Sequence, residues 1–355
     1  MKQIIKNQIK KIIKCFIEYR QYRKLSKAWK ARHLKVKKIN GYKLNSNQIA
    51  KHRKLWSQLS TRFSNDTLKV CAAISQKDNY RYVPEELFEG VIEKKLNGSF
   101  PKLFENKSYY KKLFHDSIFV DNILHKIGGI YYDMNYDPIS TKEVNSLLDD
   151  MKYPVIVKKS LDTGGGRDII FAYSKTELFN AIEKFFDLVV QPVLSPHPYF
   201  KQFHDYGLNT IRVCLYKPDH NENIHLLNAN LRLGRDGHLD NETQGGLVCN
   251  LDDDGKLNKF VVDKNGTRYY VHPNSGIEFS THPPIPNFEK LKEISIALAR
   301  KIPCVSIISL DLAMDDKGDW KIIEINLRQQ TIRFSQYAGK PFFGKFTQEV
   351  IDRCK

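Results

Sequence analysis

The first 40 residues contain almost no acid: Glu18 is the one carboxylate beside 14 lysines and arginines. This stretch has a local balance of +13, so the other 315 residues contribute only +4 to the formal net charge of +17. Solvated helix faces usually mix charges of both signs, whereas an excess of cations is typical of a segment that contacts an anionic surface. We therefore expect a basic tail and a nearly neutral globular body.

The chain also lacks clustered cysteines and long apolar runs. Its six cysteines are scattered without CxxC or other metal-like spacing, which predicts reduced thiols in an intracellular protein. No apolar run approaches the ~20 residues that a membrane-spanning helix needs. Residues 1–17 lack the continuous apolar core of a signal peptide. With 41% hydrophobic and 12% aromatic residues, the body has an ordinary globular composition, and we expect a cytoplasmic protein.

Changes in hydrophobic periodicity divide the chain into four parts. The segment "HKIGGIYYD" at 125–133 indicates a helix end, a Gly-Gly stop and a new strand. A helix is expected over 174–186, where Ser174 and Glu177 have the spacing of a capping box. The four parts are a basic amphipathic helical tail (1–45), a helical N-terminal region (46–130), a region of alternating strands and helices (131–198) and a β-rich region (199–355).

A glycine run follows the first strand of the alternating region, in "VIVKKSLDTGGGRDIIF" at 155–171. It is not a Walker A loop, because no GK[ST] follows, and it lacks the GxGxxG spacing of a dinucleotide-binding loop. A plain hairpin with a flexible polar tip explains the pattern. A flap over phosphates also explains it, because glycine N–H groups and hydroxyls donate to phosphate oxygens and a lysine adds charge. The residues concerned are Lys158, Ser160, Thr163, Gly164, Gly165 and Gly166.

The β-rich region contains a second candidate, the hairpin "SIISLDLAMDDKGDWKIIEIN" at 306–326. A turn at "DDKG" places Asp311 opposite the strand that carries Glu324. Period-2 alternation puts Glu324 and Asn326 on one face, with Ile323 and Ile325 on the other. A solvated face is one interpretation. The other is a site for a hard cation such as Mg²⁺, which prefers carboxylate and amide oxygens, and the apolar character of the strands favours it.

Polar groups elsewhere in the β-rich region extend this pattern. The segment "NTIR" contains Arg212, "NLRLG" contains Arg232 and "LDNETQGGLV" contains Asn241. Each of them alone is expected to be structural. Together with a phosphate flap and a carboxylate pair, they could supply cations and amides around a transferring phosphoryl group.

The order of these pieces resembles the ATP-grasp superfamily and, more narrowly, the sugar-transfer-associated ATP-grasp family of polysaccharide gene clusters. The matching segments are "VKKSLDTGGGRDI", "VVQPVLSPHPYF", "LNTIRV", "NLRLGRDGHLDNETQGGLV" and "SLDLAMDDKGDWKIIEIN". The resemblance implies an α+β fold in which two subdomains clamp ATP. Residues 131–198 would form the small lid subdomain, and residues 199–355 the large subdomain with the metal site.

The resemblance also implies a role for each candidate residue. Lys158 takes the position of the phosphate-binding lysine, although Lys159 stands where the family usually has proline. A second ATP-contacting lysine is expected upstream, near Lys112 or Lys126. The remaining assignments are Gln191, Pro192 and Val193 for the adenine edge, Asp311, Glu324 and Asn326 for Mg²⁺, and Arg212, Arg232 and Asn241 near the γ-phosphate and the acceptor.

The implied activity is that of an ATP-dependent carboxylate–amine ligase, which forms an amide through an acyl phosphate in surface-polysaccharide biosynthesis. A kinase acting on a sugar or lipid-linked acceptor is an alternative. A nucleic-acid-binding protein without catalytic activity is a third interpretation, but the near-neutral body speaks against it.

The tail suggests a partner of its own. Ile5, Ile9, Ile12 and Phe16 recur at helical spacing within the lysine-rich residues 1–38. An apolar stripe beside a cation excess suits the inner face of an anionic membrane. A glycosyltransferase or another acidic partner would also suit it, and nucleic acid is the least expected partner.

Overall fold

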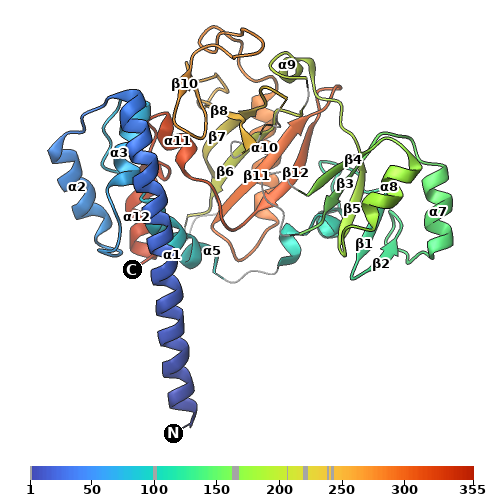
Figure 1. Cartoon of the computed structure of the whole chain (residues 1–355), viewed down its shortest axis with the longest axis horizontal. Helices are drawn as coiled ribbons and strands as arrows, with labels where there is room; N and C mark the ends of the chain where they lie inside the picture. Colours follow the sequence, from blue (N-terminus) through green and yellow to red (C-terminus); the bar gives the residue numbers. More distant parts are fainter. Residues whose placement is uncertain are drawn as a thin grey trace.

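The computed structural model of the chain describes residues 2–98, 102–161, 168–205, 207–218, 223–237, 240 and 244–355. Two antiparallel sheets organise the molecule, one of five strands and one of seven. The small sheet lies at one end of the long axis, the large sheet in the middle and the N-terminal helices at the other end (Figure 1).

The small sheet has the strand order β2-β1-β5-β3-β4. Alternate residues of β3, Val155 and Val157, point to one face and pack there against two helices, because successive side chains of a strand point to opposite faces. The second helix begins as expected, since the Ser174 side chain accepts the N–H of Glu177. The elements are β1 (Leu124–Ile127), β2 (Ile130–Tyr132), α7 (Thr141–Asp149), β3 (Val155–Lys159), β4 (Ile169–Ala172), α8 (Lys175–Ile182) and β5 (Leu188–Pro192).

The helix end expected before the Gly-Gly pair is wrong, because this segment is a β-hairpin. Ile127 pairs with Ile130 across a two-residue turn, and Gly128 and Gly129 have φ of 60° and 80°. Two positive φ values match the right-handed twist of the flanking strands, and glycine adopts them at no steric cost. The small sheet therefore begins at Leu124, before the boundary expected at 131.

The large sheet has the strand order β10-β9-β8-β7-β6-β11-β12. It matches the expected β-rich region, and β11 and β12 form the expected hairpin. The strands are β6 (Ile211–Tyr216), β7 (His225–Leu233), β8 (Leu247–Asn250), β9 (Val261–Val262), β10 (Arg268–Tyr269), β11 (Ile307–Met314) and β12 (Trp320–Asn326).

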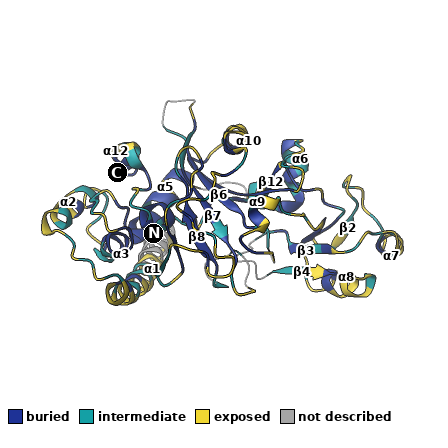
Figure 2. Cartoon of the chain, turned by 90° about the horizontal axis from the view of Figure 1, so that it is seen from above, coloured by how far each residue is buried: buried dark blue, intermediate teal, exposed yellow. Residues whose placement is uncertain are grey.

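The two faces of the large sheet are covered differently. One face packs its apolar side chains, such as Val213 and Leu310, on helix α10 (Phe288–Arg300). On the other face, Tyr216 and Ile307 are covered by η1 (Phe88–Ile92), α5 (Glu93–Asn97) and α12 (Thr347–Arg353). Figure 2 shows β6 as largely buried, whereas helices α2, α7 and α8 carry many exposed residues. This second face also has strand ends that lie nearer the small sheet. They carry polar side chains in place of apolar ones.

A single long helix forms the tail. Helix α1 (Lys2–Asn40) packs its second half on α3 (Asp66–Ser75), where Trp29 and Val36 are buried. Gly266 fits beside it with φ of 85°, and a Cβ there would lie 2.6 Å from Val36. The remaining short elements are α2 (Ser46–Trp56), α4 (Glu85–Leu87), η2 (Lys102–Glu105), η3 (Lys107–Tyr109), α6 (Tyr110–Phe114), α9 (Pro198–Lys201), α11 (Arg333–Tyr337) and η5 (Gly344–Phe346).

The cysteines and the helices of the described residues bear on two expectations from composition. Cys71, Cys214, Cys249, Cys304 and Cys354 are all free thiols, as expected from their scatter. Within the described ranges, no helix combines the length and the apolar character that crossing a bilayer requires.

Candidate active site

The centre of the candidate site is a row of charged residues across three neighbouring strands. Asp311 on β11 pairs with Arg212 on β6 and with Glu324 on β12. Residues directly opposite each other on antiparallel strands project from the same face. This register confirms that Asp311 lies opposite the strand position of Glu324, and it adds Arg212 to the same row.

A β-bulge modifies the alternation expected for β12. Asp311 pairs with Glu324, but the next residue, Leu312, pairs with Ile322, so Ile323 is an extra residue. Ile325 packs in the core together with Ile322, whereas Ile323 is half-buried and is not part of that cluster. The expectation that Ile323 and Ile325 share a face is therefore wrong. A bulge turns side chains to a new direction locally, and here it lies directly beside Glu324.

Two arginines hold the Asp311 carboxylate. Arg212 donates from Nε and Nη2 at 2.7 Å each, and Arg232 Nη2 lies 3.0 Å away. Burial alone would raise the pKa of Asp311, but the two guanidinium groups outweigh it and lower the pKa to about 2. Arg232 also donates to Thr210, whose hydroxyl donates to Asp240 at 2.6 Å. Both arginine side chains are thus fixed before any ligand binds.

Lys158 of β3 lies across from this row, on the small sheet. It is 7% exposed and projects from the face opposite to Val157, which packs in the small-sheet core. Burial and then the nearby charge of Lys107 lower the pKa of Lys158 to about 8, and the charge of Glu324 opposes them. Lys159, the alternative phosphate-binding lysine, is half-buried and follows it on the strand.

Lys107 is the site residue that sequence reasoning missed. Its Nζ lies 2.6 Å from Glu324 Oε1, and its backbone N–H donates to the carbonyl of Ser160, just after β3. Asn122 supports this position, since it donates to the Lys107 carbonyl and accepts from Gln191. Lys107 thus lies between the two sheets. The lysine-rich segment around it, "ENKSYYKK", left no signal that distinguished one lysine from another.

The two lysines expected upstream lie elsewhere. Lys126 pairs with Leu188, which belongs to the small-sheet core, and it donates to the carbonyl of Ile182 near the end of α8. Lys112 lies with its Nζ 4.8 Å from the centre of the Tyr136 ring. Neither is placed against the charged row, so Lys107 replaces them as the candidate for the second nucleotide lysine.

Other predicted residues border the same region. Ser160 is 1% exposed, and its Oγ has no hydrogen-bond partner among the described residues. Gln191 is buried and donates to Asn122, whereas Pro192 and Val193 are exposed at the end of β5. Thr163, Gly164, Gly165, Gly166 and Asn241 lie outside the described residues.

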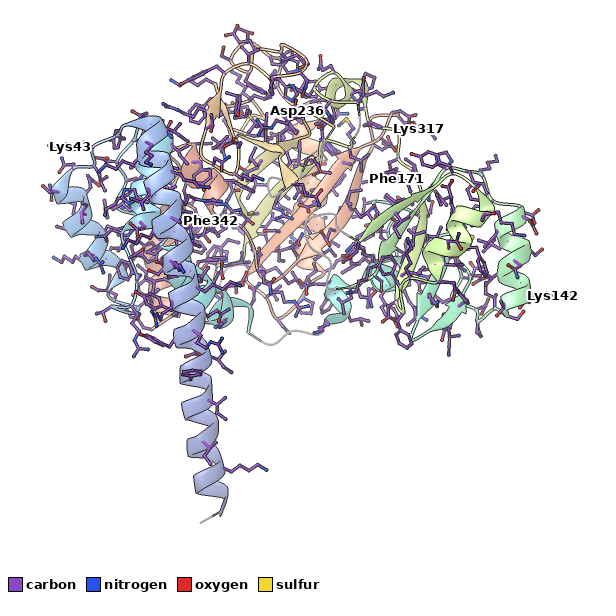
Figure 3. The ribbon with its side chains drawn as sticks, in the orientation of Figure 1. Lys43, Lys142, Phe171, Asp236, Lys317 and Phe342 are labelled. Atoms are coloured by element: carbon purple, nitrogen blue, oxygen red, sulfur yellow. The ribbon has the colours of Figure 1, made fainter. Side chains whose placement is uncertain are left out.

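An aromatic side chain, Phe171, lies on the same face of the small sheet as Lys158. Phe171 of β4 pairs with Ile156 of β3, so it projects from the face that carries Lys158. Figure 3 shows Phe171 on the side of the small subdomain that is nearest the large sheet. Its ring is 39% exposed and adds apolar surface beside the cations.

The carboxylate and amide oxygens at one end of the charged row suit Mg²⁺. Glu324 and Asn326 project from one face, so the Glu324 carboxylate and the Asn326 Oδ1 offer the oxygens that Mg²⁺ prefers. Asn326 Nδ2 is buried without a partner among the described residues, and as an N–H donor it suits an oxygen of a bound ligand instead. From the described residues, Asp311 accepts three N–H groups, whereas a carboxylate can accept roughly four. In the described part of the chain, no group of three or more His, Cys, Asp or Glu side chains is arranged to hold a metal ion by itself. A cation held here would therefore share its coordination with oxygens of a bound ligand, as Mg²⁺ does with phosphates.

Cations outnumber carboxylates in this region, because Lys107, Lys158, Arg212 and Arg232 surround Asp311 and Glu324. Such an excess complements a polyphosphate together with its metal ion. The arrangement spans two antiparallel sheets, with a lysine of the small sheet facing carboxylates and arginines of the large one. This is the arrangement of an ATP-grasp protein.

Comparison with known proteins agrees with this class. The sequence profile described as "Sugar-transfer associated ATP-grasp" matches residues 173–350, which is half of the chain. The chain belongs to the sugar-transfer associated ATP-grasp family. No curated protein sequence matches it.

The chain is also similar, at low sequence identity, to several solved structures. Biotin carboxylase from Campylobacter jejuni, in complex with β-γ-ATP, gives 14% identity over 71% of this chain and 47% of that chain, with a TM-score of 0.42. L-amino acid ligase from Bacillus licheniformis is 13% identical over 71% of this chain and 50% of that chain, with a TM-score of 0.41. N5-carboxyaminoimidazole synthetase from Staphylococcus aureus, complexed with ADP, is 11% identical over 68% of this chain and 51% of that chain, with a TM-score of 0.41. The chain spans about half the length of these proteins.

Proposed function

We propose that this protein is an ATP-dependent carboxylate–amine ligase that acts in the biosynthesis or modification of a surface polysaccharide. The observation that carries the proposal is the charged region between the sheets. Lys107 and Lys158 face the row formed by Arg212, Asp311 and Glu324. Family membership supports nucleotide chemistry at this site and an association with sugar transfer.

Each group has a distinct role in the proposed reaction. Lys158 and Lys107 bind the phosphates, and the unpartnered Ser160 hydroxyl donates to a phosphate oxygen. The backbone at residues 190–193 reads the edge of the base. Glu324, Asn326 and Asp311 would hold Mg²⁺, which neutralises charge on the phosphoryl oxygens when bound. Asn241 is proposed beside the acceptor.

Arg212 and Arg232 are suited to charge that develops on the transferring group. Both are held by Asp311, and each has further N–H groups available in the planar fork of a guanidinium. Donors that are fixed in advance stabilise a transition state without reorganising during the reaction. Their ion pairs with Asp311 therefore preorganise the site.

The proposed chemistry has two steps. A carboxylate oxygen of the substrate attacks the γ-phosphorus, the bond to the bridging oxygen of ADP breaks, and an acyl phosphate forms. An amine nitrogen then attacks the acyl carbon, the carbon–oxygen bond breaks, and phosphate leaves while the nitrogen loses a proton to solvent. Binding both reactants in one closed site supplies proximity and excludes water, which would otherwise hydrolyse the acyl phosphate.

Product analysis tests the proposal. The protein is incubated with ATP, Mg²⁺ and a panel of uronic acids, amino acids and amines, and the products are identified by mass spectrometry. A ligase releases ADP and phosphate and forms an amide. With a carboxylate labelled in heavy oxygen, one labelled atom is expected in the released phosphate, because the acyl carbon–oxygen bond breaks in the second step.

A phosphorylated acceptor without an amide would instead identify a kinase and overturn the ligase proposal. Absence of nucleotide binding by calorimetry would overturn both. The Glu324→Gln variant serves as the inactive control in each assay.

A further inference from the structure

The first half of helix α1 extends away from the body. In Figures 1 and 3 it projects beyond all other elements, with the N-terminus at its tip. The second half is anchored: Trp29 and Val36 are buried on α3, and Lys94 donates to Gln21. Before Gln21, the described side chains are exposed. A straight helix over residues 2–20 is about 28 Å long, so this is an extended surface rather than a frayed end.

The projecting half carries an apolar face that no described part of the chain covers. Ile9, Ile13, Phe16 and Ile17 are 50%, 52%, 59% and 57% exposed. Their spacing of i, i+4, i+7 and i+8 places them on one face of a helix. Exposed apolar side chains are ordinary when they are scattered, but a contiguous set marks an interaction surface.

Cations border this face. Residues 1–20 contain six lysines and arginines and one acid. The guanidinium of Arg20 lies 5.9 Å from the centre of the Phe16 ring, and that of Arg23 lies 5.9 Å from the Tyr19 ring. Long basic side chains of this kind keep their stems on apolar surface while the charged head reaches a polar layer.

The charge decides between the possible occupants of this face. A second copy of the chain would cover the apolar residues, but it would bring two cation-rich helices together. An anionic lipid surface covers the apolar residues and neutralises the cations at the same time. We propose that residues 2–20 form a reversible anchor, lying in the interface of an anionic membrane with Ile9, Ile13, Phe16 and Ile17 toward the acyl chains.

The continuity of α1 gives this anchor a mechanical consequence. Because the same helix continues into the part that packs on α3, the body is connected to the membrane without a flexible linker. The small sheet lies at the opposite end of the molecule from α1 (Figure 1). An anchored molecule therefore keeps the region between the sheets open to substrates.

Vesicle co-sedimentation of the full chain tests the proposal. The probes are phosphatidylcholine vesicles, with and without phosphatidylglycerol. We expect binding to the phosphatidylglycerol vesicles only, and its loss at high salt. The Ile13→Gln, Phe16→Gln double variant should bind at least about tenfold more weakly, because two buried apolar side chains are lost. Neutralising Lys6, Lys10 and Lys14 to Gln, three cations within residues 2–20, should weaken binding on the order of 100-fold.

Matched controls separate the anchor from general surface effects. Phe186→Gln removes an exposed aromatic residue at the far end of the molecule. Neutralising the exposed Lys142, Lys152 and Lys184 to Gln changes the net charge by the same amount as the triple anchor variant. Both controls should bind like the wild-type chain, and all variants should keep ATP turnover in solution.

Three results would overturn the proposal. The full chain could remain in the supernatant with anionic vesicles at low salt, or it could bind neutral vesicles equally well. Sedimentation velocity without lipid could instead show a dimer that the Ile13→Gln, Phe16→Gln variant dissociates. That last result would assign the face to self-association.

Discussion

The four cations between the sheets differ in how firmly each is held. Arg212 and Arg232 are fixed by Asp311, whose low pKa keeps it ionised at any physiological pH. Among the described residues no carboxylate is bonded to Lys158 in this way, and burial and its neighbour Lys107 lower its pKa to about 8. The arginines are therefore permanent parts of the site, whereas Lys158 is the group whose charge can change with conditions.

Glu324→Gln should abolish most ATP turnover while the fold is kept. The amide preserves the shape but removes the charge that pairs with Lys107 and that would bind Mg²⁺. We expect a loss of roughly 10²–10³-fold in kcat, measured by ADP release. Glu293→Gln, on the exposed face of α10, is the matched control. Turnover near that of the wild type would remove Glu324 from the site.

Lys158 should matter more than Lys159 for nucleotide affinity. Only Lys158 projects from the sheet face opposite to the core residue Val157. We expect Lys158→Met to weaken ATP binding roughly 10- to 100-fold by calorimetry, the value of a charged hydrogen bond. Lys159→Met should have a smaller effect. If Lys159→Met is the more damaging change, the sheet face assigned here to the nucleotide is wrong.

Nucleotide affinity should fall as the pH rises through about 8. Below that pH Lys158 is an ammonium ion that attracts phosphates, and above it the group is neutral in the free protein. Bound phosphates favour the charged form, so binding takes up a proton at high pH and weakens there. Calorimetry across this range measures the slope. Lys158→Arg stays charged and should give a flatter profile, and an unchanged slope in that variant would contradict the assignment.

At the scale of elements, short segments far apart in the sequence position the site. Glu105, in η2, accepts the N–H of Leu327 and a hydrogen bond from Arg328, just after β12. Tyr110 accepts the N–H of Ile325. The segment that contains Lys107 is thus attached along the strand that carries Glu324, which explains why the two side chains meet.

Asn97 connects helix α5 to the ends of β11 and β12. Its side chain is 2% exposed, donates to the carbonyls of Ile307 and Leu327, and accepts the N–H groups of Ser306 and Ile307. Asn97→Ala leaves these buried groups unpaired, which should lower the free energy of unfolding by about 3 kcal/mol. Urea denaturation measures this loss.

The exposed Asn135 provides the control for that substitution, because its hydrogen bonds are local, to Asp133. Asn135→Ala should change the midpoint of urea denaturation very little. An equal, small effect of both substitutions would show that α5 does not hold the strand ends.

At the scale of the whole molecule, the two halves of α1 should respond differently to truncation. A chain that begins at Gln21 loses only the projecting half and should keep its melting temperature. A chain that begins at Gly41 also loses Trp29 and Val36, which are buried on α3. Removing these two side chains should cost about 3–6 kcal/mol, measured by thermal and urea unfolding. Equal stability of the two shortened chains would contradict this division of α1.

Local pattern alone predicted the elements that dominate the site. The N-cap at Ser174, the alternation in β3 and the turn of the 306–326 hairpin are properties of neighbouring residues, and the order of the motifs was enough to indicate the ATP-grasp class. Local sequence predicts structure less well where two kinds of structure, such as a helix end and a hairpin turn, have the same residue pattern. The sequence at 125–133 predicts a helix end, and the structure has a hairpin there, because a Gly-Gly pair can stop a helix and can also turn a hairpin.

The sequence by itself determined the residue types of the site and the division into a basic tail and a near-neutral body, because composition and periodicity are written in neighbouring residues. Only the tertiary structure decided which groups meet. The pairing of Lys107 with Glu324 joins residues 217 positions apart, and that of Arg212 with Asp311 joins residues 99 apart. Contacts at such separations depend on strand order and register, which follow from the packing of the whole core.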